Sequence, residues 1–232
     1  LDVDTRDQAL QLVEGLPEGQ VFKVGLRLFT AEGPSLLQEI ARKGKRVFLD
    51  LKLHDIPNTV AGAVTMAARQ GAAMMTLHAS GGRAMMQKAV EAVKEESLVS
   101  GCPKPLLLGV TILTSLKSAE LVDIGMPPEA GSQVLKLAHL AQDSGMDGIV
   151  CSPQELSMVR AEFGKDFLVV TPGIRPAWAA ADDQKRIMTP ARAQEQGADY
   201  LVIGRPIIAA ESPGEAFHRI ALELASVEKN SS

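Results

Sequence analysis

The sequence has little cysteine: only Cys102 and Cys151 occur among 232 residues, and they do not form a C-x-x-C pair. This usage excludes a disulfide framework and predicts a reduced, cytoplasmic protein. Four histidines are present, at His54, His78, His139 and His218. Their spacing is not that of a zinc site, and no cofactor motif accompanies them, so we expect neither a bound metal nor an organic cofactor.

Long apolar runs are also absent, and none reaches the roughly 18 residues of a membrane span. The chain opens on Leu1-Asp2-Val3-Asp4, which has neither the basic start nor the apolar stretch of a signal peptide. Basic residues do not predominate, since the net charge is -4. We therefore expect no membrane and no nucleic-acid partner. A hydrophobic fraction of 46% indicates a globular core.

Short apolar runs alternate with longer amphipathic segments along the whole chain. The apolar runs predict strands at Leu1–Val3, Val21–Val24, Val47–Leu49, Met74–Leu77, Leu106–Thr111, Gly148–Cys151, Phe167–Val170 and Tyr200–Ile203. The amphipathic segments predict helices at Arg6–Glu14, Pro34–Arg42, Pro57–Arg69, Gly82–Glu95, Glu129–Gln142, Pro153–Phe163, Pro190–Gln196 and Glu211–Glu228. Residues 117–128 are the least regular and are expected to form an extended loop.

Glycine recurs at the joints between a helix and the next strand, as in Gln70-Gly71-Ala72 and Gln196-Gly197-Ala198-Asp199. A glycine after a helix is a common left-handed stop, so the joints mark one unit repeated about eight times. This predicts an α/β fold, a (β/α)8 TIM barrel, with residues 1–232 forming a single domain. A doubly wound open sheet would need fewer strands, and no G-x-G-x-x-G follows the first one.

The segment Asp50-Leu-Lys-Leu-His-Asp-Ile-Pro-Asn-Thr59 directly follows the apolar run Val47–Leu49. Because side chains alternate along a strand, Asp50 and Lys52 should project to the same side at its carboxyl end. Asp55 follows where the strand gives way to a helix. Two carboxylates and an ammonium are costly to crowd together unless the charges are used, so we interpret the cluster as a proton-handling site.

Lys23 ends the preceding predicted strand and can extend this cluster to four alternating charges. Each member taken singly is also explained as an ordinary ion pair, and Asp55 as a residue at a helix start before Pro57. Four such charges at one barrel mouth favour catalysis, because active sites of these barrels lie at the carboxyl ends of the strands.

Lys52 is expected to act as a proton donor. Flanking carboxylates favour its ammonium form, which is a good acid and a poor nucleophile, whereas Schiff-base chemistry needs the neutral amine. Asp50 would be a fixed negative charge that repels a substrate carboxylate, and Lys52 would attract a developing carbanion. Loss of carbon dioxide followed by protonation from Lys52 fits both charges.

Two later loops predict a phosphate site. Thr171-Pro-Gly-Ile-Arg175 follows the seventh predicted strand, and Gly204-Arg205-Pro206-Ile207 follows the eighth. These are the two loops that commonly bind phosphate in such barrels, where glycine admits the backbone and arginine adds a forked donor. Tight turns with surface arginines are the alternative.

Other polar residues carry weaker hypotheses. The long loop 175–186, with Gln184 as a candidate contact, is either a lid over the phosphate or a loop without a role. Thr114 and Ser152 suit hydrogen bonds to a heterocycle, but a cap or turn explains each equally well. A structural role is favoured for His78, and Cys151 is interpreted as a small apolar residue.

Together these segments resemble the orotidine 5'-phosphate decarboxylase family over essentially the whole chain. The matching segments are Leu1-Asp2, Phe22-Lys23-Val24-Gly25, Phe48 to Thr59, Leu113-Thr114-Ser115, Thr171 to Arg175, and Val202-Ile203-Gly204-Arg205. The resemblance implies cofactor-free decarboxylation of orotidine 5'-monophosphate to uridine 5'-monophosphate (UMP), the last step of de novo UMP synthesis. It also suggests that a few residues precede Leu1.

The resemblance further implies a role for each matching residue. The catalytic network would be Lys23, Asp50, Lys52 and Asp55, with Lys52 protonating C6. In a homodimer, Asp55 and Thr59 would serve the partner's site. Asp2 and Lys23 would bind the ribose and Thr114 the pyrimidine. The phosphate would be bound by Gln184, Gly204 and Arg205, with Arg175 close by.

Three rival functions remain open from the sequence. The first is a metal-dependent sugar-phosphate decarboxylase or aldolase, whose family members resemble this chain in Asp-x-Lys-x-x-Asp but carry an acidic metal ligand where Lys23 stands. The second is a Schiff-base aldolase that uses Lys52. The third is a non-catalytic sensor of a phosphate ligand, which would keep Gly204 and Arg205 but would not need the four charges.

Overall fold

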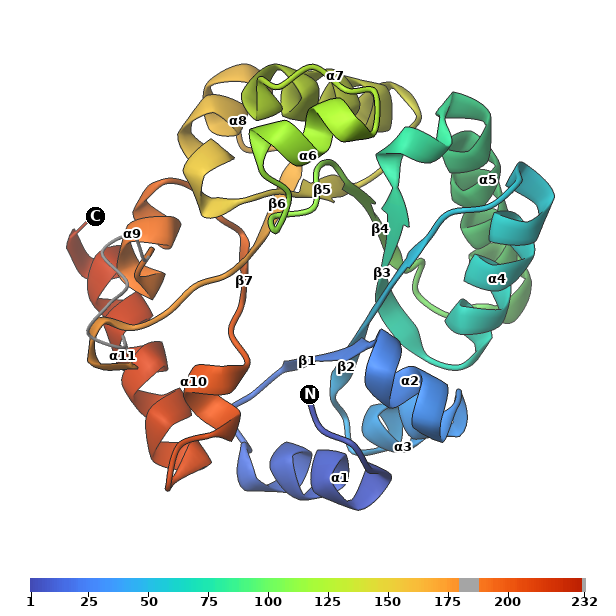
Figure 1. The fold of residues 1–232 in the computed structure, drawn as a ribbon. Coiled ribbons are helices and arrows are strands. Elements are labelled where there is room, and N and C mark those ends of the chain that lie inside the picture. Colours follow the sequence, from blue (N-terminus) through green and yellow to red (C-terminus); the bar gives the residue numbers. More distant parts are fainter. Residues whose placement is uncertain (180–187, 231–232) are drawn as a thin grey trace.

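The computed structural model describes residues 1–179 and 188–230. In this part of the chain, seven parallel strands pair in the order β1-β2-β3-β4-β5-β6-β7. They are β1 (Val21–Gly25), β2 (Arg46–Leu53), β3 (Ala72–His78), β4 (Leu106–Val110), β5 (Gly148–Val150), β6 (Leu168–Pro172) and β7 (Tyr200–Val202). The strands curve around a common centre and the helices lie outside them (Figure 1). The predicted α/β barrel class is therefore confirmed.

The helices between the strands follow the predicted alternation. The longer ones are α1 (Arg6–Gly15), α3 (Ser35–Arg42), α4 (Pro57–Arg69), α5 (Arg83–Ser100), α7 (Ala130–Asp143), α8 (Leu156–Phe163) and α11 (Pro213–Asn230). The shorter ones are α2 (Leu26–Glu32), α6 (Ser118–Asp123), α9 (Pro190–Glu195), α10 (Arg205–Ile208) and the 3-10 turns η1 (Ala79–Gly81), η2 (Pro153–Glu155) and η3 (Ala177–Ala179). Within the described ranges, no helix combines the length and apolar character needed to span a membrane.

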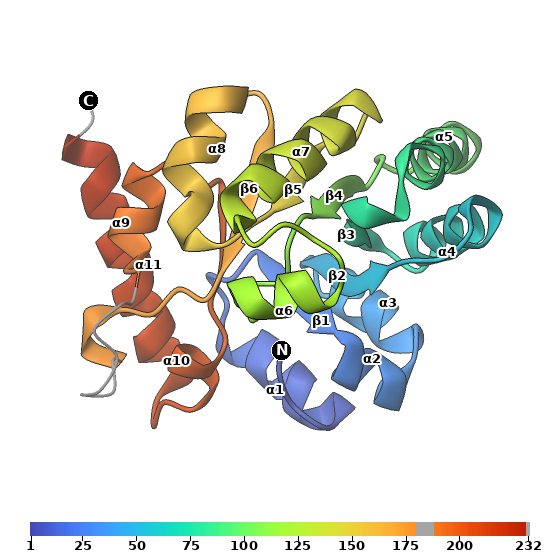
Figure 2. The same cartoon turned by 45° about the horizontal axis from the view of Figure 1, so that its top comes forward.

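The prediction of a strand at Leu1–Val3 is wrong. This segment is irregular, and its amino group donates one hydrogen bond to the Lys23 carbonyl at 2.8 Å. A single bond does not make a strand ladder, so β1 and β7 are the two edges of the described sheet. Figure 1 and Figure 2 show the amino terminus near α1 and β1.

The expectation of a loop at residues 117–128 is also wrong, because α6 lies within it. The backbone N–H of Lys117 donates to the Glu120 carboxylate at 2.8 Å, which fixes the first turn of this helix. Leu121 is buried against the main core, whereas Val122 and Ile124 are exposed. A helix of six residues is too short to show a clear apolar period, so its pattern gave no signal.

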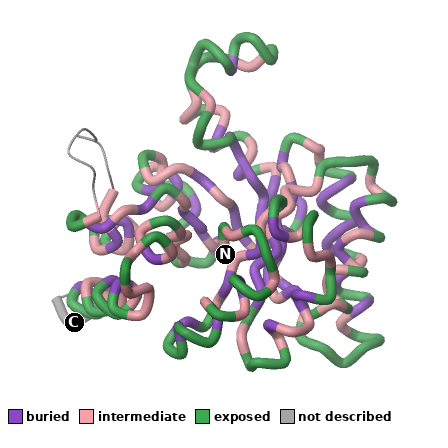
Figure 3. Tube along the Cα trace, turned by 60° about the horizontal axis from the view of Figure 1, so that its bottom comes forward, coloured by how far each residue is buried: buried purple, intermediate pink, exposed green. Residues whose placement is uncertain are grey.

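Apolar side chains pack on both faces of the strands. Inside the barrel, Phe48, Met74, Leu108 and Val170 form a separate buried cluster. The larger core fills the space between the strands and the outer helices, and Figure 3 shows buried segments concentrated there. The interior cluster fills the barrel, so polar side chains are left for the rims.

Two aspartates clamp the amino-terminal rim. The N–H of Asp147, just before β5, donates to the Leu107 carbonyl at 3.0 Å, and its carboxylate accepts from the Leu107 N–H at 2.8 Å. Asp199, just before β7, makes the same pair of bonds with Val169, at 2.9 and 2.7 Å. The repeated Gly-x-Asp joint therefore ties β5 to β4 and β7 to β6.

Candidate active site

Three of the predicted charges meet at the carboxyl-terminal rim. The Asp50 carboxylate of β2 places Oδ2 3.0 Å from Lys52 Nζ and 3.3 Å from Lys23 Nζ of β1. The register places Gly25 beside Asp50, and a Cβ at Gly25 would lie 3.3 Å from Lys23 Nζ. Glycine at position 25 therefore leaves room for the ammonium group.

Asp50 is the most enclosed member of the cluster, with 13% of its side chain exposed. Burial alone would raise the pKa of Asp50, but Lys23 and Lys52 and hydrogen bonds from Lys52 and Thr76 bring it below its usual value. The carboxylate is therefore ionised at neutral pH. Two ammonium groups around one carboxylate leave one excess positive charge, which suits an anionic ligand.

The backbone at Lys52 departs from the strand. Its φ is 52°, which makes it the one non-glycine residue with positive φ in the described structure. The pairing of β2 with β3 shifts in register between Val47 and Phe48, and after Leu49 it resumes only at Leu53. Asp50 and Lys52 do lie together, but a left-handed turn places them there and simple alternation along a strand does not. Such a conformation costs about 1–3 kcal/mol and is typical of functional sites.

Thr76 of β3 is a site residue that the sequence reasoning missed. Its buried hydroxyl donates to Asp50 Oδ1 at 2.9 Å and accepts from the Lys52 N–H at 2.9 Å. The only signal in the sequence was a hydroxyl in the otherwise apolar run Met74–Leu77. Such a residue is more often a plain strand residue, because threonine is common in strands.

A cavity of about 540 Å³ opens beside the charge cluster. Its polar lining includes Asp2, Lys23, Asp50, Lys52, Arg175 and Arg205. Its apolar floor includes Phe48, Met74 and Val170 from inside the barrel. This size suits a small-molecule ligand, and the combination of an apolar floor with cations at the rim suits an anionic one.

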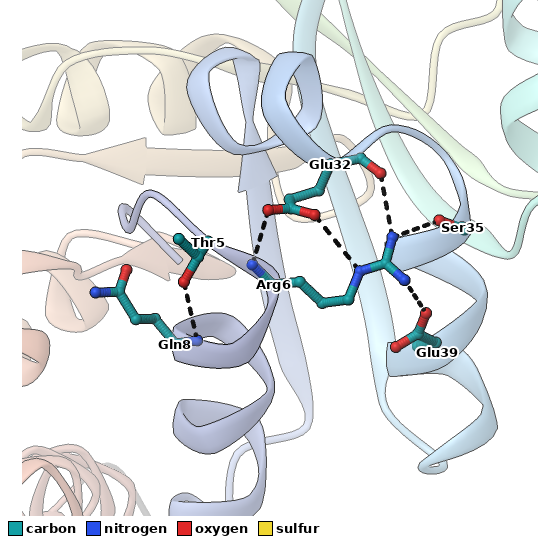
Figure 4. A network of polar contacts seen from close by, with 6 residues as sticks. All are labelled: Thr5, Arg6, Gln8, Glu32, Ser35 and Glu39. Atoms are coloured by element: carbon teal, nitrogen blue, oxygen red, sulfur yellow. Dashed lines mark hydrogen bonds and ion pairs between the residues drawn. The ribbon is translucent and has the colours of Figure 1, made fainter.

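Asp2 is held at this mouth from both sides. On one side the Leu1 amino group binds the Lys23 carbonyl. On the other side α1 begins at Arg6, whose N–H donates to Glu32 Oε1 at 3.0 Å and whose guanidinium bonds to α2 and α3 (Figure 4). The short segment that carries Asp2 is thus fastened to β1 and to two helices.

The two predicted phosphate loops lie on the same cavity. Gly173, with φ 78°, follows β6 and precedes Arg175, whose N–H donates to the Met188 carbonyl at 3.1 Å. Gly204 follows β7, and Arg205 is exposed at the rim. Gly173, Arg175, Gly204 and Arg205 all line the cavity. Gln184 and most of the proposed lid lie outside the described residues.

Three predicted site residues do not join the cluster within the described chain. Asp55 and Thr59 are exposed, and Asp55 Oδ1 accepts from the Ile56 N–H at 2.6 Å. Thr114 is exposed and is not among the residues that line the cavity. The neighbouring Ile56 is 66% exposed, so this tip of the chain faces away from the cluster.

The weaker candidates have local contacts or shifted pKa values. Ser152 accepts a hydrogen bond from the Gln154 N–H, as a cap does. Burial and the nearby Glu155 carboxylate raise the pKa of Cys151 to about 12, so its thiol remains protonated. Burial, His54 and Lys52 lower the pKa of His78, whose ring lies 5.3 Å from that of His54. In the described ranges no three histidine, cysteine or acidic side chains gather in a metal-binding arrangement.

Comparison with known proteins agrees with this geometry. Residues 1–220 match the sequence model of the "Orotidine 5'-phosphate decarboxylase / HUMPS family". The orotidine 5'-phosphate decarboxylase of Gloeothece citriformis is 50% identical over 228 residues, which cover 98% of this chain and 96% of that protein. The enzyme of the same name from Paramagnetospirillum magneticum is 52% identical over 226 residues, covering 97% and 96%.

Solved structures give the same result. The crystal structure of orotidine 5'-phosphate decarboxylase from Lactobacillus acidophilus has a TM-score of 0.82 at 38% identity and covers 97% of this chain and 96% of that one. An uncharacterized conserved protein from Geobacillus kaustophilus has a TM-score of 0.83 at 36% identity, with 97% of each chain covered. This chain therefore belongs to the orotidine 5'-phosphate decarboxylase / HUMPS family.

Proposed function

We propose that this protein decarboxylates orotidine 5'-monophosphate to UMP, the last step of de novo UMP synthesis. The observation that carries the proposal is the Asp50 carboxylate, bonded at Oδ2 to Lys52 Nζ at 3.0 Å beside a cavity lined by further cations. The names of the 50% identical relatives support the same activity.

The site must stabilise an electron pair on C6 of the substrate and then deliver a proton to the same carbon. When the bond between C6 and the carboxylate breaks, carbon dioxide leaves as a neutral molecule and the electron pair stays on C6. The Lys52 ammonium stabilises that pair and then transfers a proton to C6, and it regains a proton from water. Asp50 holds the ammonium in place and disfavours the substrate carboxylate, so the fixed charges favour the transition state over the bound substrate.

The remaining residues would bind the substrate. Asp2 and Lys23 would bind the ribose hydroxyls, Thr114 the pyrimidine, and Gly204, Arg205 and Gln184 the phosphate, with Arg175 nearby. The cavity position of Asp2, Lys23, Arg175, Gly204 and Arg205 supports their part of this assignment. A cytoplasmic location is also part of the proposal, supported by two unpaired cysteines.

The direct test follows the ultraviolet absorbance of orotidine 5'-monophosphate mixed with the purified protein, with and without EDTA. We expect the orotate chromophore to disappear at the same rate in both samples. Turnover abolished by EDTA would instead support the metal-dependent sugar-phosphate relatives. No specific observation favours that alternative, because the Lys23 ammonium lies 3.3 Å from Asp50 and would repel a bound cation. Borohydride trapping of the substrate on Lys52 would reveal a Schiff base.

The dimer is a second part of the proposal: Asp55 and Thr59 would reach the site of a partner subunit. The exposure of both residues, next to the exposed Ile56, supports it. The test mixes Lys52→Ala with Asp55→Ala, each inactive alone. If each site takes Lys52 from one subunit and Asp55 from the other, mixed dimers hold one intact site, and about one quarter of wild-type activity returns. No recovery after subunit exchange would place both residues in one subunit's site.

A further inference from the structure

The Thr76 hydroxyl links the side chain of Asp50 to the backbone of Lys52. Its oxygen is 2.9 Å from Asp50 Oδ1 and 2.9 Å from the Lys52 backbone nitrogen. The residue is 1% exposed, so water does not replace either bond. A hydroxyl has one proton, and because an ionised carboxylate only accepts, that proton goes to Asp50 and leaves a lone pair for the Lys52 N–H.

We infer that Thr76 is a positioning residue for the decarboxylation, which fixes the orientation of the Asp50 carboxylate and the left-handed backbone of Lys52 at the same time. This inference rests on the proposed function, in which Asp50 and Lys52 carry the chemistry. Thr76 itself touches neither ammonium group in the described contacts and acts through its two neighbours.

The strand pairing explains why a side chain is needed here. Between Leu49 and Leu53 the regular pairing of β2 with β3 is interrupted, so no ladder partner is available for the Lys52 N–H. The Thr76 hydroxyl takes the place of that missing carbonyl acceptor. Without it, the N–H would be left unsatisfied in a partly buried place and the strained turn at Lys52 would lose its support.

The same hydroxyl fixes the plane of the carboxylate. With Oδ1 held by Thr76, Oδ2 faces Lys52 Nζ at 3.0 Å and Lys23 Nζ at 3.3 Å. A carboxylate free to rotate about its last torsion would share its charge differently between the two ammonium groups. Because misplacement of a reacting group by about 1 Å can lower a rate roughly 100-fold, this constraint should show in kcat.

A matched control is available at Thr111. This residue is also buried, and its hydroxyl also bonds to a neighbouring strand, at 3.1 Å from the Val150 carbonyl. It has no bond to the charge cluster. Thr111 directly follows β4, so removing its hydroxyl tests the loss of a buried threonine bond to a strand without altering Asp50 or Lys52.

The experiment compares Thr76→Val, Thr76→Ser and Thr111→Val with the wild type, after urea unfolding has shown that each is folded. For Thr76→Val we expect kcat to fall about 100-fold, in line with a displaced reacting group, while affinity for UMP changes little. Thr76→Ser should restore most of the rate, and Thr111→Val should keep it. Thr76→Ala serves in place of the valine variant should that variant not fold.

A second readout does not depend on turnover. The Thr76 hydrogen bond is one of the causes that lower the pKa of Asp50, so NMR titration of its carboxyl carbon should show a higher pKa in Thr76→Val and no change in Thr111→Val. A folded Thr76→Val with wild-type kcat and an unchanged Asp50 pKa would overturn the inference. A wild type without turnover would overturn the proposed function alone, because the titration still tests whether Thr76 orients Asp50.

Discussion

The two rims of the barrel use aspartate in opposite ways. At the amino-terminal rim, Asp147 and Asp199 each accept from a backbone N–H and from one cation, Lys104 and Arg160 respectively. At the carboxyl-terminal rim, Asp50 accepts from the Lys52 ammonium and the Thr76 hydroxyl and forms a second ion pair with Lys23, beside an open cavity.

The difference shows how one residue type acquires two roles. An aspartate matched by one cation and the main chain is electrostatically satisfied and fastens two strands together. An aspartate next to two cations leaves one excess positive charge. In addition, the left-handed backbone at Lys52 is strained by about 1–3 kcal/mol. Unbalanced charge next to a cavity is therefore the feature that separates the functional rim from the structural one.

The largest expected effect compares two lysines, one at each rim. Lys52→Ala should lower kcat by at least about 1,000-fold while UMP still binds, because in the proposed mechanism Lys52 is both the proton donor and the charge that stabilises C6. Lys104→Ala removes an ammonium 2.6 Å from Asp147 and should leave kcat unchanged. Steady-state kinetics and UMP titration provide the comparison, and near-normal turnover by Lys52→Ala would remove this lysine from the mechanism.

The second largest effect is expected on KM, in a comparison of two arginines, one at each rim. Arg205 is exposed on the cavity, and Arg46 is exposed where β2 begins. A charged hydrogen bond to phosphate contributes roughly 1.5–3 kcal/mol, so Arg205→Ala should raise KM by about 10- to 100-fold. Arg46→Ala should leave KM as it is. Equal KM values for the two variants would place the phosphate elsewhere.

A substitution at the amino-terminal rim should lower the stability of the protein without lowering its kcat. Asp199→Ala leaves the Val169 N–H without its acceptor and removes the ion pair with Arg160, which keeps its bonds to backbone carbonyls. This loss should lower the free energy of unfolding by about 1–3 kcal/mol. The folded protein should keep its kcat. Urea unfolding measures the loss, with Asp166→Ala, an exposed aspartate, as the control. If Asp199→Ala were as stable as that control, the clamp would have no structural role.

The smallest effect is the pH dependence of stability that Asp50 contributes. Its folded pKa lies below the unfolded value of 3.8, so the unfolded chain binds the proton more readily. The contribution is complete above that value and is lost as pH falls through the folded pKa. The difference in unfolding free energy between the wild type and Asp50→Asn should therefore shrink below about pH 4. A difference that grows in acid would mean that the pKa is raised.

The sequence predicted the barrel because its signals are local and repeated. Apolar runs, helix starts and joints such as Gln196-Gly197 recur with each unit, and most predicted bounds differ from the structure by a few residues. Leu1–Val3 failed as a strand because strand formation depends on partners across the sheet, which an apolar pattern does not contain. The helix α6 was not predicted because its six residues are too few to show a full apolar period.

Only the part of the site that lies at the ends of predicted strands could be predicted from the sequence. Asp50 and Lys52 follow from their positions after an apolar run, and Lys23 from its position near the end of one. The left-handed turn at Lys52 and the bridge from Thr76 depend on how β2 and β3 fit together, which is a tertiary property. The exposure of Asp55 likewise has no local signature, because whether a charge faces its own site or a partner's depends on assembly.

In the proposed mechanism, the unbalanced charge around Asp50 stabilises negative charge at C6, and Lys52 donates the C6 proton. By microscopic reversibility, the same group should remove that proton from the product. The most direct measurement is NMR of UMP incubated with the protein in D2O. We expect deuterium to replace hydrogen at C6 with the wild type and Lys104→Ala but not with Lys52→Ala; exchange at the wild-type rate with Lys52→Ala would contradict the account.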